Sequence, residues 1–339
     1  MKKVLTLTLL SLFALSNSAC QKGLAYGDPN AVIVAAPQDW WPQLEDSVFA
    51  VLSPDVFTLR DERMFRLRYE DPTRPDWGLK RMFKEEVVIG SRDDPWIAEV
   101  LQELDDTVTV EVPGIVETRN VWAQNQMVTA ILVDPSGDVN EQVLSLVDEV
   151  HDALEARFRQ GARMRMFVSG VDSVMADSVM RIAHFGMLLP EVYRFGSEDS
   201  LYVFRNDNPD PSELIRQFGV TWKTPMPEEA LPVDSLLDWK EALSEQYYSY
   251  PQVVEREELR TRNLQMGEME ITEVRGAWAN PPESWPAAGP FILWGVTCPS
   301  QDRYYLIDAW LYAPGKDKWE YILQLETILE SFRCGPPGT

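Results

Sequence analysis

Over the first 160 residues, strand-like apolar runs alternate with helical patterns, and this order constrains the fold more than any other feature. The strand-like runs occupy residues 31–35, 64–69, 86–89 and 127–133, and the helical patterns occupy residues 38–52, 95–104 and 139–159. Strands that alternate with helices build a sheet covered by helices. We therefore predict an α/β domain over residues 31–160.

The pattern changes after Gly161, where we predict a break followed by a connecting helix within residues 161–190. Beyond it, strand patterns cluster and one helical pattern closes the chain. The predicted strands are residues 192–195, 201–204, 269–275, 291–298 and 304–312, and the predicted helices are residues 233–248 and 314–332. Clustered strands before a closing helix predict an α+β domain over residues 191–339 with a mainly antiparallel sheet.

The N-terminus has the organisation of a secretory signal over residues 1–19. Lys2 and Lys3 precede an apolar stretch over residues 4–15, which is shorter than the roughly 20 residues that a membrane span needs. Ala19 and Cys20 follow, and this segment resembles the lipobox of bacterial lipoproteins, in which the cysteine is acylated. The alternative is an ordinary signal peptide cleaved after Ala19, which would leave Cys20 as a free thiol.

Acylation of Cys20 would tether the chain to a membrane through residues 20–30, because each buried CH₂ contributes about 0.8 kcal/mol. The lipobox pattern prefers Leu three residues before the cysteine, and this chain has Asn17 there. By resemblance to lipoprotein sorting, Gln21 favours the outer membrane, with the protein facing the periplasm or the surface. We therefore expect a lipid-anchored protein of the cell envelope, with the membrane and possible envelope proteins as its partners.

The charge balance excludes some partner classes. The chain has 54 acidic residues and 31 Lys and Arg residues, with a formal net charge of −23. Such a charge repels nucleic acids and anionic lipid surfaces, so we expect no nucleic-acid partner. It also keeps a protein soluble, which is the simpler reason for it.

Two cysteines remain after Cys20, namely Cys298 and Cys334. In an oxidising compartment they could form a disulfide, whose loop of about 36 residues would contribute roughly 3–4 kcal/mol. They could equally be two separate buried thiols.

Motifs for catalysis by histidine, phosphate binding or metal binding are missing from the sequence. His151 and His184 lie in predicted helices, and no Gly-x-Ser-x-Gly or Gly-rich phosphate loop is present. Residues 206–210 crowd oxygen ligands as a Ca²⁺ loop does, but the glycine and the glutamate of such a loop are missing. We expect no metal and no cofactor, and no catalytic residue can be named.

Carboxylates are so numerous that the sequence cannot select a catalytic pair for a glycosidase. Asp39 is the best single candidate, because Trp40 and Trp41 follow it and apolar surroundings raise a carboxyl pKa. The alternative is that Asp39 caps a helix whose two tryptophans belong to the core.

A Glu-x-Arg-x-x-Trp-Ala pattern occurs twice, with Arg119 and Trp122 in one copy and Arg275 and Trp278 in the other. The functional interpretation is one pocket in which the arginines bind an anionic group and the tryptophans stack. The structural interpretation is a local Glu–Arg ion pair beside a buried Trp.

Trp285 lies in a loop over residues 280–290 that contains four prolines and therefore cannot be regular structure. A Trp in such a stiff loop either covers the core or forms an exposed contact for a sugar or a protein.

Several segments resemble one family of bacterial lipoproteins, designated domain of unknown function number 4837. The segments are residues 119–123, 273–278, 289–291, 312–316 and 323–329. The chain departs from the family at Ala288, where paired glycines are usual. The resemblance covers nearly the whole exported chain and implies export and two domains, but no activity, cofactor or partner.

The balance of these features favours a non-catalytic binding or assembly module of the cell envelope. A carboxylate-based hydrolase of envelope glycans is the first alternative, and a structural accessory of an outer-membrane complex is the second.

Overall fold

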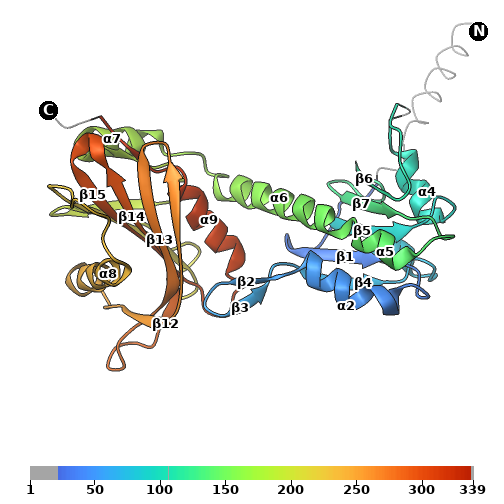
Figure 1. The fold of residues 1–339 in the computed structure, drawn as a ribbon, viewed down its shortest axis with the longest axis horizontal. Coiled ribbons are helices and arrows are strands. Elements are labelled where there is room, and N and C mark those ends of the chain that lie inside the picture. The colour runs from blue at the N-terminus through green and yellow to red at the C-terminus, as the bar shows by residue number, and fades with distance from the viewer. Residues whose placement is uncertain (1–21, 106, 337–339) are drawn as a thin grey trace, which may run out of the picture. The chain divides into compact units, whose positions relative to one another are not determined.

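The computed structural model describes residues 22–105 and 107–336. The predicted signal peptide and Cys20 lie outside the described residues. Within the described part, no helix is long and apolar enough to cross a membrane. The chain divides into two compact units, of which the first contains residues up to 54 and residues 64–155, and the second contains residues 55–63 and residues from 156 onward (Figure 1).

The first unit is built on a five-stranded sheet with the order β4-β1-β5-β7-β6. The strands are β1 (Ala31–Ala35), β4 (Arg66–Glu70), β5 (Glu85–Gly90), β6 (Gly114–Arg119) and β7 (Met127–Leu132). All neighbours are parallel except β6, which runs antiparallel to β7 at one edge. This mixed sheet confirms the predicted α/β class.

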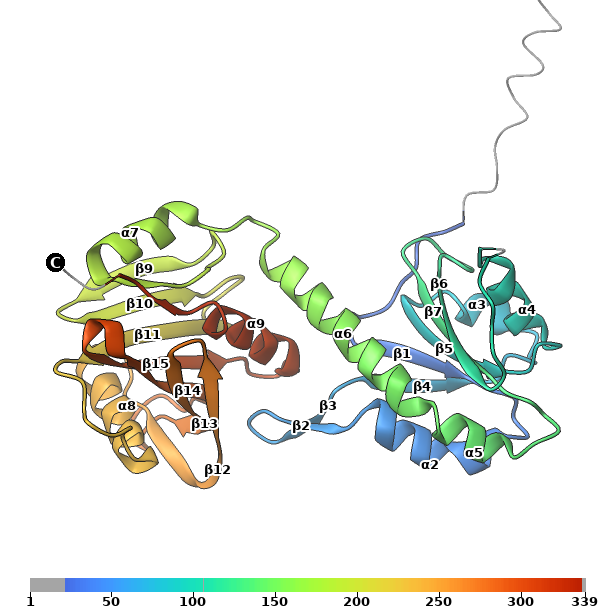
Figure 2. The same ribbon diagram turned by 45° about the horizontal axis from the view of Figure 1, so that its top comes forward.

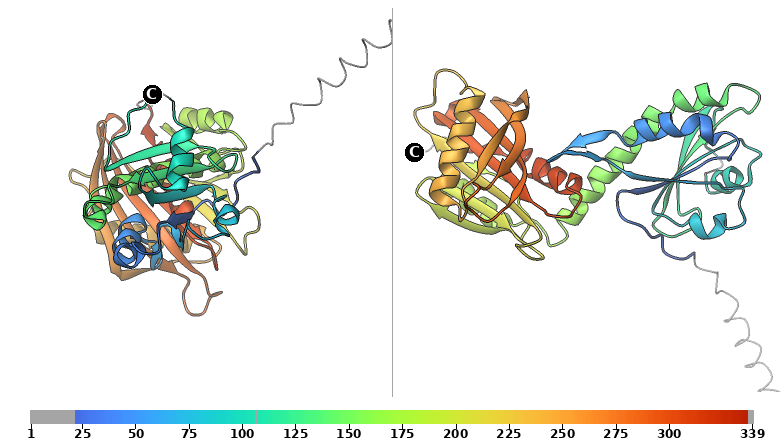
Figure 3. Two further views of the ribbon diagram at one scale, coloured as in Figure 1. Left: turned by 90° about the vertical axis from the view of Figure 1, so that its right-hand side faces the viewer. Right: turned by 90° about the horizontal axis from the view of Figure 1, so that it is seen from below.

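Helices cover both faces of this sheet (Figures 2 and 3). They are α2 (Trp41–Leu52), α3 (Trp77–Lys80), α4 (Pro95–Gln102), α5 (Val139–Leu144) and the first part of α6 (Val147–Met166). Trp77 of α3 and Ile97 of α4 pack with Ile33 and Val88 of the central strands in one buried cluster. Burial on both faces explains why β1 is a continuous apolar run and why β5 and β7 are apolar over most of their length.

The second unit contains a seven-stranded antiparallel sheet with the order β12-β13-β14-β15-β11-β10-β9. These strands are β9 (Arg194–Glu198), β10 (Leu201–Asn206), β11 (Ile215–Lys223), β12 (Val253–Met266), β13 (Met269–Ala279), β14 (Ala288–Cys298) and β15 (Arg303–Tyr312). The antiparallel sheet confirms the predicted α+β class.

Helix α8 (Val233–Tyr247) covers one face of this sheet, and its Leu236 and Leu237 are buried against Leu293 of β14 and Leu306 of β15. Helices α7 (Ser173–Ala183) and α9 (Trp319–Leu329) belong to the opposite face (Figure 2). Smaller elements complete the unit: β2 (Asp55–Phe57), β3 (Asp61–Arg63), β8 (Phe185–Gly186), β16 (Arg333–Cys334) and a 3₁₀ turn at Pro299–Gln301.

The predicted break at Gly161 is wrong, because α6 continues through it to Met166. The guanidinium of Arg165 lies over Gly161, in the space that a larger side chain would occupy. The helix predicted within residues 161–190 is present as α7, but it is shorter than expected, because it starts only after Asp172. The Asp172 carboxylate caps α7 by accepting a hydrogen bond of 2.8 Å from the Met175 backbone N–H.

Candidate functional site

Alternate residues of the C-terminal sheet point to opposite faces, and this determines which side chains can share a site. On β13, Val274 and Trp278 belong to the apolar cluster under α8. Glu273 instead pairs with Arg275, and Arg275 also pairs with Glu326 of α9. Residues three apart on a strand cannot face the same way, so Arg275 and Trp278 do not form one site.

A cavity of about 720 Å³ opens on the α8 face of the sheet. Its walls come from strands β10, β11, β13 and β15, from the segment that follows α8, and from the loop between β13 and β14. Seven aromatic side chains line it: Tyr247, Tyr248, Tyr250, Trp278, Trp285, Trp310 and Tyr312. Its size is within the range of small-molecule sites, roughly 300–1,000 Å³.

The polar groups of the cavity are mostly uncharged. They include the amides of Gln217, Gln252 and Asn280, while Arg205 is the one cation among the described lining residues. Nε of Arg205 lies 3.4 Å from a carboxylate oxygen of Asp207. Among the residues that the structure describes, none of those lining the cavity is Asp, Glu or His. The arrangement therefore suits hydrogen bonding and stacking better than proton transfer.

A buried ion pair lies behind this wall. Lys240 of α8 and Asp308 of β15 both have fully buried side chains, and Lys240 Nζ lies 2.9 Å from Asp308 Oδ1 and 3.1 Å from Oδ2. Lys240 also donates to Oε1 of Gln252 at 2.8 Å, and the Tyr248 hydroxyl donates to Asp308 Oδ2 at 2.9 Å. Two side chains of the cavity are thus held by one buried network.

Burial dominates the titration of this network. It lowers the pKa of Lys240 although the neighbouring carboxylate of Asp308 acts in the opposite direction. Burial, together with the charge of Asp308, raises the pKa of Tyr248 well above its usual value. The phenol therefore stays protonated at neutral pH and presents a fixed hydroxyl.

Gly219 leaves space for the Tyr248 hydroxyl because it has no side chain. This residue is paired with Asp308 across β11 and β15. A Cβ atom at Gly219 would lie 2.8 Å from the Tyr248 hydroxyl oxygen. The absence of a side chain here is what allows Tyr248 to reach the carboxylate.

Two exposed aromatic residues stand at the rim of the cavity. The exposed fraction is 69% for Trp285 and 56% for Tyr250. Asn280 holds the proline-rich loop, since its side-chain amide donates to the Trp285 carbonyl at 2.7 Å and its backbone N–H donates to the Ala287 carbonyl at 2.8 Å. Trp285 therefore does not cover the core, and its ring is available to a ligand.

The opposite face of the sheet carries a charged cleft of about 490 Å³. In it, the Glu273 carboxylate accepts hydrogen bonds of 2.6 Å from Nε of Arg262, 2.6 Å from Nε of Arg275 and 2.9 Å from the Trp294 indole. Burial alone would raise the pKa of Glu273, but these hydrogen bonds outweigh it and lower the pKa to about 2. Nη1 of Arg275 also donates to Glu326 at 2.6 Å.

Glu330, one turn beyond Glu326 on the chain, lines the same cleft. Burial and the nearby Glu326 charge raise the pKa of Glu330. Glu326 is held by Arg159 and Arg275 at 3.1 and 2.6 Å. A carboxyl with a raised pKa beside a second carboxyl that is paired with arginines is one arrangement in which a general acid can act, although Glu330 itself is an exposed residue.

The other copy of the Arg–Trp pattern lies in the first unit. Arg119 is an exposed residue at the end of β6. The Trp122 indole N–H donates to Glu99, and the Arg81 guanidinium lies 5.2 Å from the centre of the Trp122 ring. Each copy therefore has its partners within its own unit.

Asp39 is neither a carboxyl in apolar surroundings nor the N-cap of α2, although Trp41 belongs to the core as the second interpretation expected. Asp39 is exposed. The N-cap of α2 is Trp40, without a side-chain capping hydrogen bond, and not Asp39. Trp41 is buried and stacks on Tyr69 at a ring separation of 4.4 Å.

Both histidines have structural contacts. Nδ1 of His151 lies 3.3 Å from the Leu52 carbonyl, and Nε2 lies 3.5 Å from Glu155. His184 ends α7 in a left-handed conformation. Within the described residues, no cluster of His, Cys, Asp and Glu could hold a metal ion.

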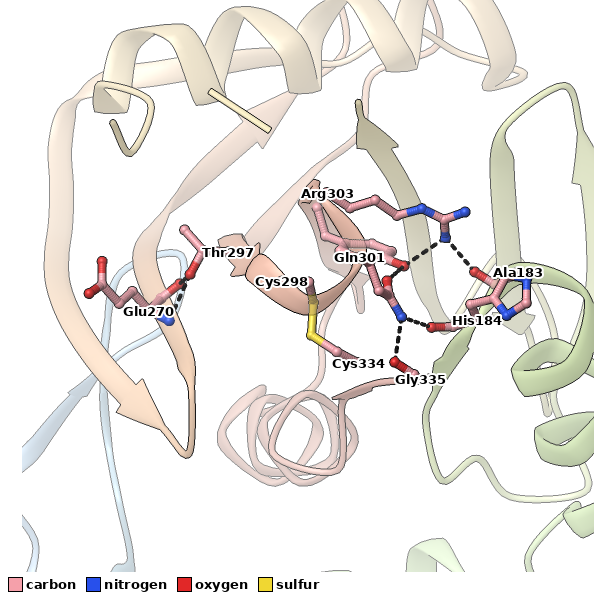
Figure 4. The surroundings of a disulfide bond; sticks show 10 residues. Ala183, His184, Glu270, Thr297, Cys298, Gln301, Arg303, Cys334 and Gly335 are labelled. Atoms are coloured by element: carbon pink, nitrogen blue, oxygen red, sulfur yellow. Dashed lines mark hydrogen bonds between the residues drawn. A yellow bond between two sulfur atoms is a disulfide. The ribbon is translucent and has the colours of Figure 1, made fainter. Parts of the chain in front are cut away.

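A disulfide joins Cys298, at the end of β14, to Cys334 near the C-terminus, with 6.1 Å between their Cα atoms (Figure 4). Beside it, Nε2 of Gln301 donates to the carbonyls of His184 and Gly335 at 2.5 and 2.8 Å. The segment after α9 is thereby fixed to the end of α7 and to the sheet.

Residues 172–331 match a family described as "Domain of unknown function (DUF4837)". The C-terminal part of the chain is thus similar to that family, over slightly less than half of the full length. The DUF4837 region includes every aromatic residue that lines the cavity, from Tyr247 to Tyr312. The resemblance was predicted to cover nearly the whole exported chain, but the match covers only residues 172–331. Arg119 and Trp122 lie outside it. The search of curated proteins gave no match.

Several solved structures are similar to part of the chain, each at 12% sequence identity. The Ran-binding protein Mog1p of Saccharomyces cerevisiae covers 45% of this chain and 91% of its own, with a TM-score of 0.31. PsbP (CyanoP) of Synechocystis sp. PCC 6803 covers 44% of this chain and 86% of its own, with a TM-score of 0.30. LpqN of Mycobacterium tuberculosis is described as involved in cell envelope biogenesis. It covers 45% of this chain and 83% of its own, with a TM-score of 0.29.

Proposed function

We propose that this chain is a lipid-anchored protein of the bacterial cell envelope whose C-terminal unit binds a ligand without transforming it. The binding role rests on one observation, the aromatic cavity of about 720 Å³ on the α8 face. The anchor rests on the signal-like residues 1–19 and on Cys20, and Gln21 favours the outer membrane. Envelope proteins are partners in this proposal.

The chemistry of the cavity supports binding over catalysis. The described lining residues include no carboxylate or imidazole that could move a proton. The Lys240 ammonium is fully buried and paired with Asp308, so a ligand cannot reach it without breaking the pair. The Tyr248 hydroxyl donates its proton to Asp308, so toward a ligand it acts as a hydrogen-bond acceptor.

Binding of the neutral dye N-phenyl-1-naphthylamine tests the cavity. The wild-type chain, produced without its first nineteen residues and with Cys20→Ser, is expected to bind one dye with a rise in fluorescence. Ala287→Trp adds a large ring to the cavity wall and is expected to weaken this binding at least tenfold. Ser197→Trp adds the same ring at an exposed position on β9 and is expected to leave binding unchanged. Equal binding by all three proteins would refute a binding role for the cavity.

Fatty-acid labelling tests the anchor. Wild-type protein expressed in a bacterial host is expected to incorporate labelled palmitate and to float with membranes in a density gradient. Cys20→Ala is expected to lose both properties while it is still exported. Labelling of the Cys20→Ala variant would show that the anchor is wrong.

A carboxylate-based hydrolase of envelope glycans is the second candidate, and the raised pKa of Glu330 beside Glu326 favours it. Release of reducing ends from purified peptidoglycan by wild-type protein, and its loss in Glu330→Gln, would establish this activity. Equal release by both proteins would exclude Glu330 as the acid.

A further inference from the structure

The cavity combines flat aromatic rings with uncharged hydrogen-bonding groups. We propose that its ligand is a neutral oligosaccharide, which specifies the ligand of the binding role proposed above and rests on it. A pyranose ring has C–H faces that pack on the faces of Trp and Tyr, and a perimeter of hydroxyls that both donate and accept hydrogen bonds. The cavity offers both kinds of contact, with seven aromatic side chains beside the amides of Gln217, Gln252 and Asn280.

The charges favour a neutral ligand over a charged one. A cationic ligand would find no carboxylate among the described lining residues. An anionic ligand would find only the Arg205 guanidinium, which already faces Asp207, on a protein whose net charge is −23. Long-range repulsion by so acidic a protein lowers the local concentration of anions.

The amide groups of the cavity argue against a long lipid chain as its ligand. Gln217 and Gln252 are almost fully buried, with exposed fractions of 4% and 3%. A lipid chain that filled the cavity would displace water from Asn280 and from the tyrosine hydroxyls without replacing its hydrogen bonds. Each polar group left without a partner costs binding affinity.

The supply of acceptors argues against an extended peptide. Oε1 of Gln252 already accepts from Lys240, and Oε1 of Gln217 lies 3.4 Å from Nη1 of Arg205. Peptide N–H groups would therefore compete for acceptors that are in use. Sugar hydroxyls can instead accept from the amide N–H groups and also donate to the hydroxyl oxygens of Tyr247 and Ser212. The protons of these two hydroxyls are already donated to Asp199 and Asp210.

The rim indicates a ligand longer than one ring. Trp285 and Tyr250 are both more than half exposed and lie at the mouth of the cavity. A ligand that ended inside the cavity would leave these two rings in water. Further sugar rings that project from the mouth would cover them, so affinity is expected to rise with the number of rings.

Isothermal titration with a panel of soluble probes tests this proposal. The neutral probes are chitotriose, cellotetraose, maltotetraose and mannotetraose, and the comparison probes are tetragalacturonate, a proline-rich decapeptide and N-phenyl-1-naphthylamine. At least one neutral oligosaccharide is expected to bind the wild-type chain, and more tightly than its own disaccharide. Trp285→Ala and Tyr250→Ala are each expected to weaken that binding about tenfold or more, because Trp and Tyr are typical interface hot spots. Phe195→Ala, which removes an exposed ring on β9, is expected to leave the affinity unchanged.

Three results would overturn the proposal in distinguishable ways. Binding of the dye, the decapeptide or tetragalacturonate without binding of any neutral oligosaccharide would show that the cavity binds ligands of another class. Failure of every probe, the dye included, would overturn the binding role of the cavity as well. Oligosaccharide binding that survives both rim substitutions unchanged would place the sugar site elsewhere on the chain.

Discussion

The buried pair of Lys240 and Asp308 gives the most decisive test of how the cavity wall is held. Neither side chain is exposed, and the pair also fixes Tyr248 and Gln252. Lys240→Met removes the ammonium while keeping most of the side-chain volume. The Asp308 carboxylate would then remain buried with the Tyr248 hydroxyl as its remaining partner in the network.

Removal of one partner of a buried ion pair typically costs about 3–5 kcal/mol, because the other charge stays buried without compensation. A folded unit of 150–250 residues loses about 2–4 °C in Tm per kcal/mol, so Lys240→Met is expected to lower Tm by roughly 6–20 °C. The double variant Lys240→Met/Asp308→Leu removes both charges. It still leaves the Tyr248 hydroxyl without its acceptor, at a cost of about 1–3 kcal/mol. The double variant is therefore expected to be more stable than Lys240→Met.

Thermal unfolding followed by near-ultraviolet circular dichroism measures this difference, because Tyr248 and Trp310 adjoin the pair. Lys223→Met is the control: it removes an exposed ammonium that lies 4.3 Å from the centre of the Trp239 ring, and it is expected to cost about 1 kcal/mol or less. A Lys240→Met protein as stable as this control would refute the argument. So would a double variant less stable than Lys240→Met.

Three further predictions concern the same unit. Glu273 has its pKa lowered to about 2, below the usual 4.5, so it stabilises the fold above pH 4.5 and this contribution disappears as pH falls toward 2. Urea titrations measure how far the free energy of unfolding falls between pH 5 and pH 2. With allowance for partial solvation, this fall is expected to be about 2–3 kcal/mol larger in wild type than in Glu273→Gln. An equal fall in the two proteins would contradict this. Replacement of both Cys298 and Cys334 by Ser opens a link between residues 36 apart and is expected to cost roughly 3–4 kcal/mol in the same assay, whereas an unchanged midpoint would show that the bond adds nothing. Gly289→Ala would place a Cβ atom 1.9 Å from the Leu311 carbonyl oxygen and is expected to lower stability by about 2–3 kcal/mol, and a neutral effect would show that β14 and β15 can separate at this point.

The periodic parts of the fold could be predicted because their apolar patterns are strong. Buried strands such as β1 and β7 are continuous apolar runs, and α8 was predicted to within one residue at its end. Strands β11 and β12 were missed. The 14-residue β12 is an exposed edge strand with mostly polar residues, so it buries almost nothing that a period-two pattern could reveal. In β11, Gly219 interrupts the apolar residues, and its role depends on Tyr248, which lies far along the chain.

The cavity could not be predicted for a related reason, since its aromatic residues come from segments that only the sheet brings together. Spacing along the sequence gave the wrong grouping: Arg275 and Trp278 are close in sequence, but the pleat of β13 sends them to opposite faces. The informative sequence feature was local rigidity, because the proline-rich loop holds Trp285 out of the core at the cavity mouth. What gives the wall its shape is instead a set of long-range pairings, in which Gly219 makes room for Tyr248, Tyr248 reaches Asp308, and Asp308 neutralises Lys240. Each of these residues alone has an ordinary explanation, and only their contacts show that they support one face of a binding cavity.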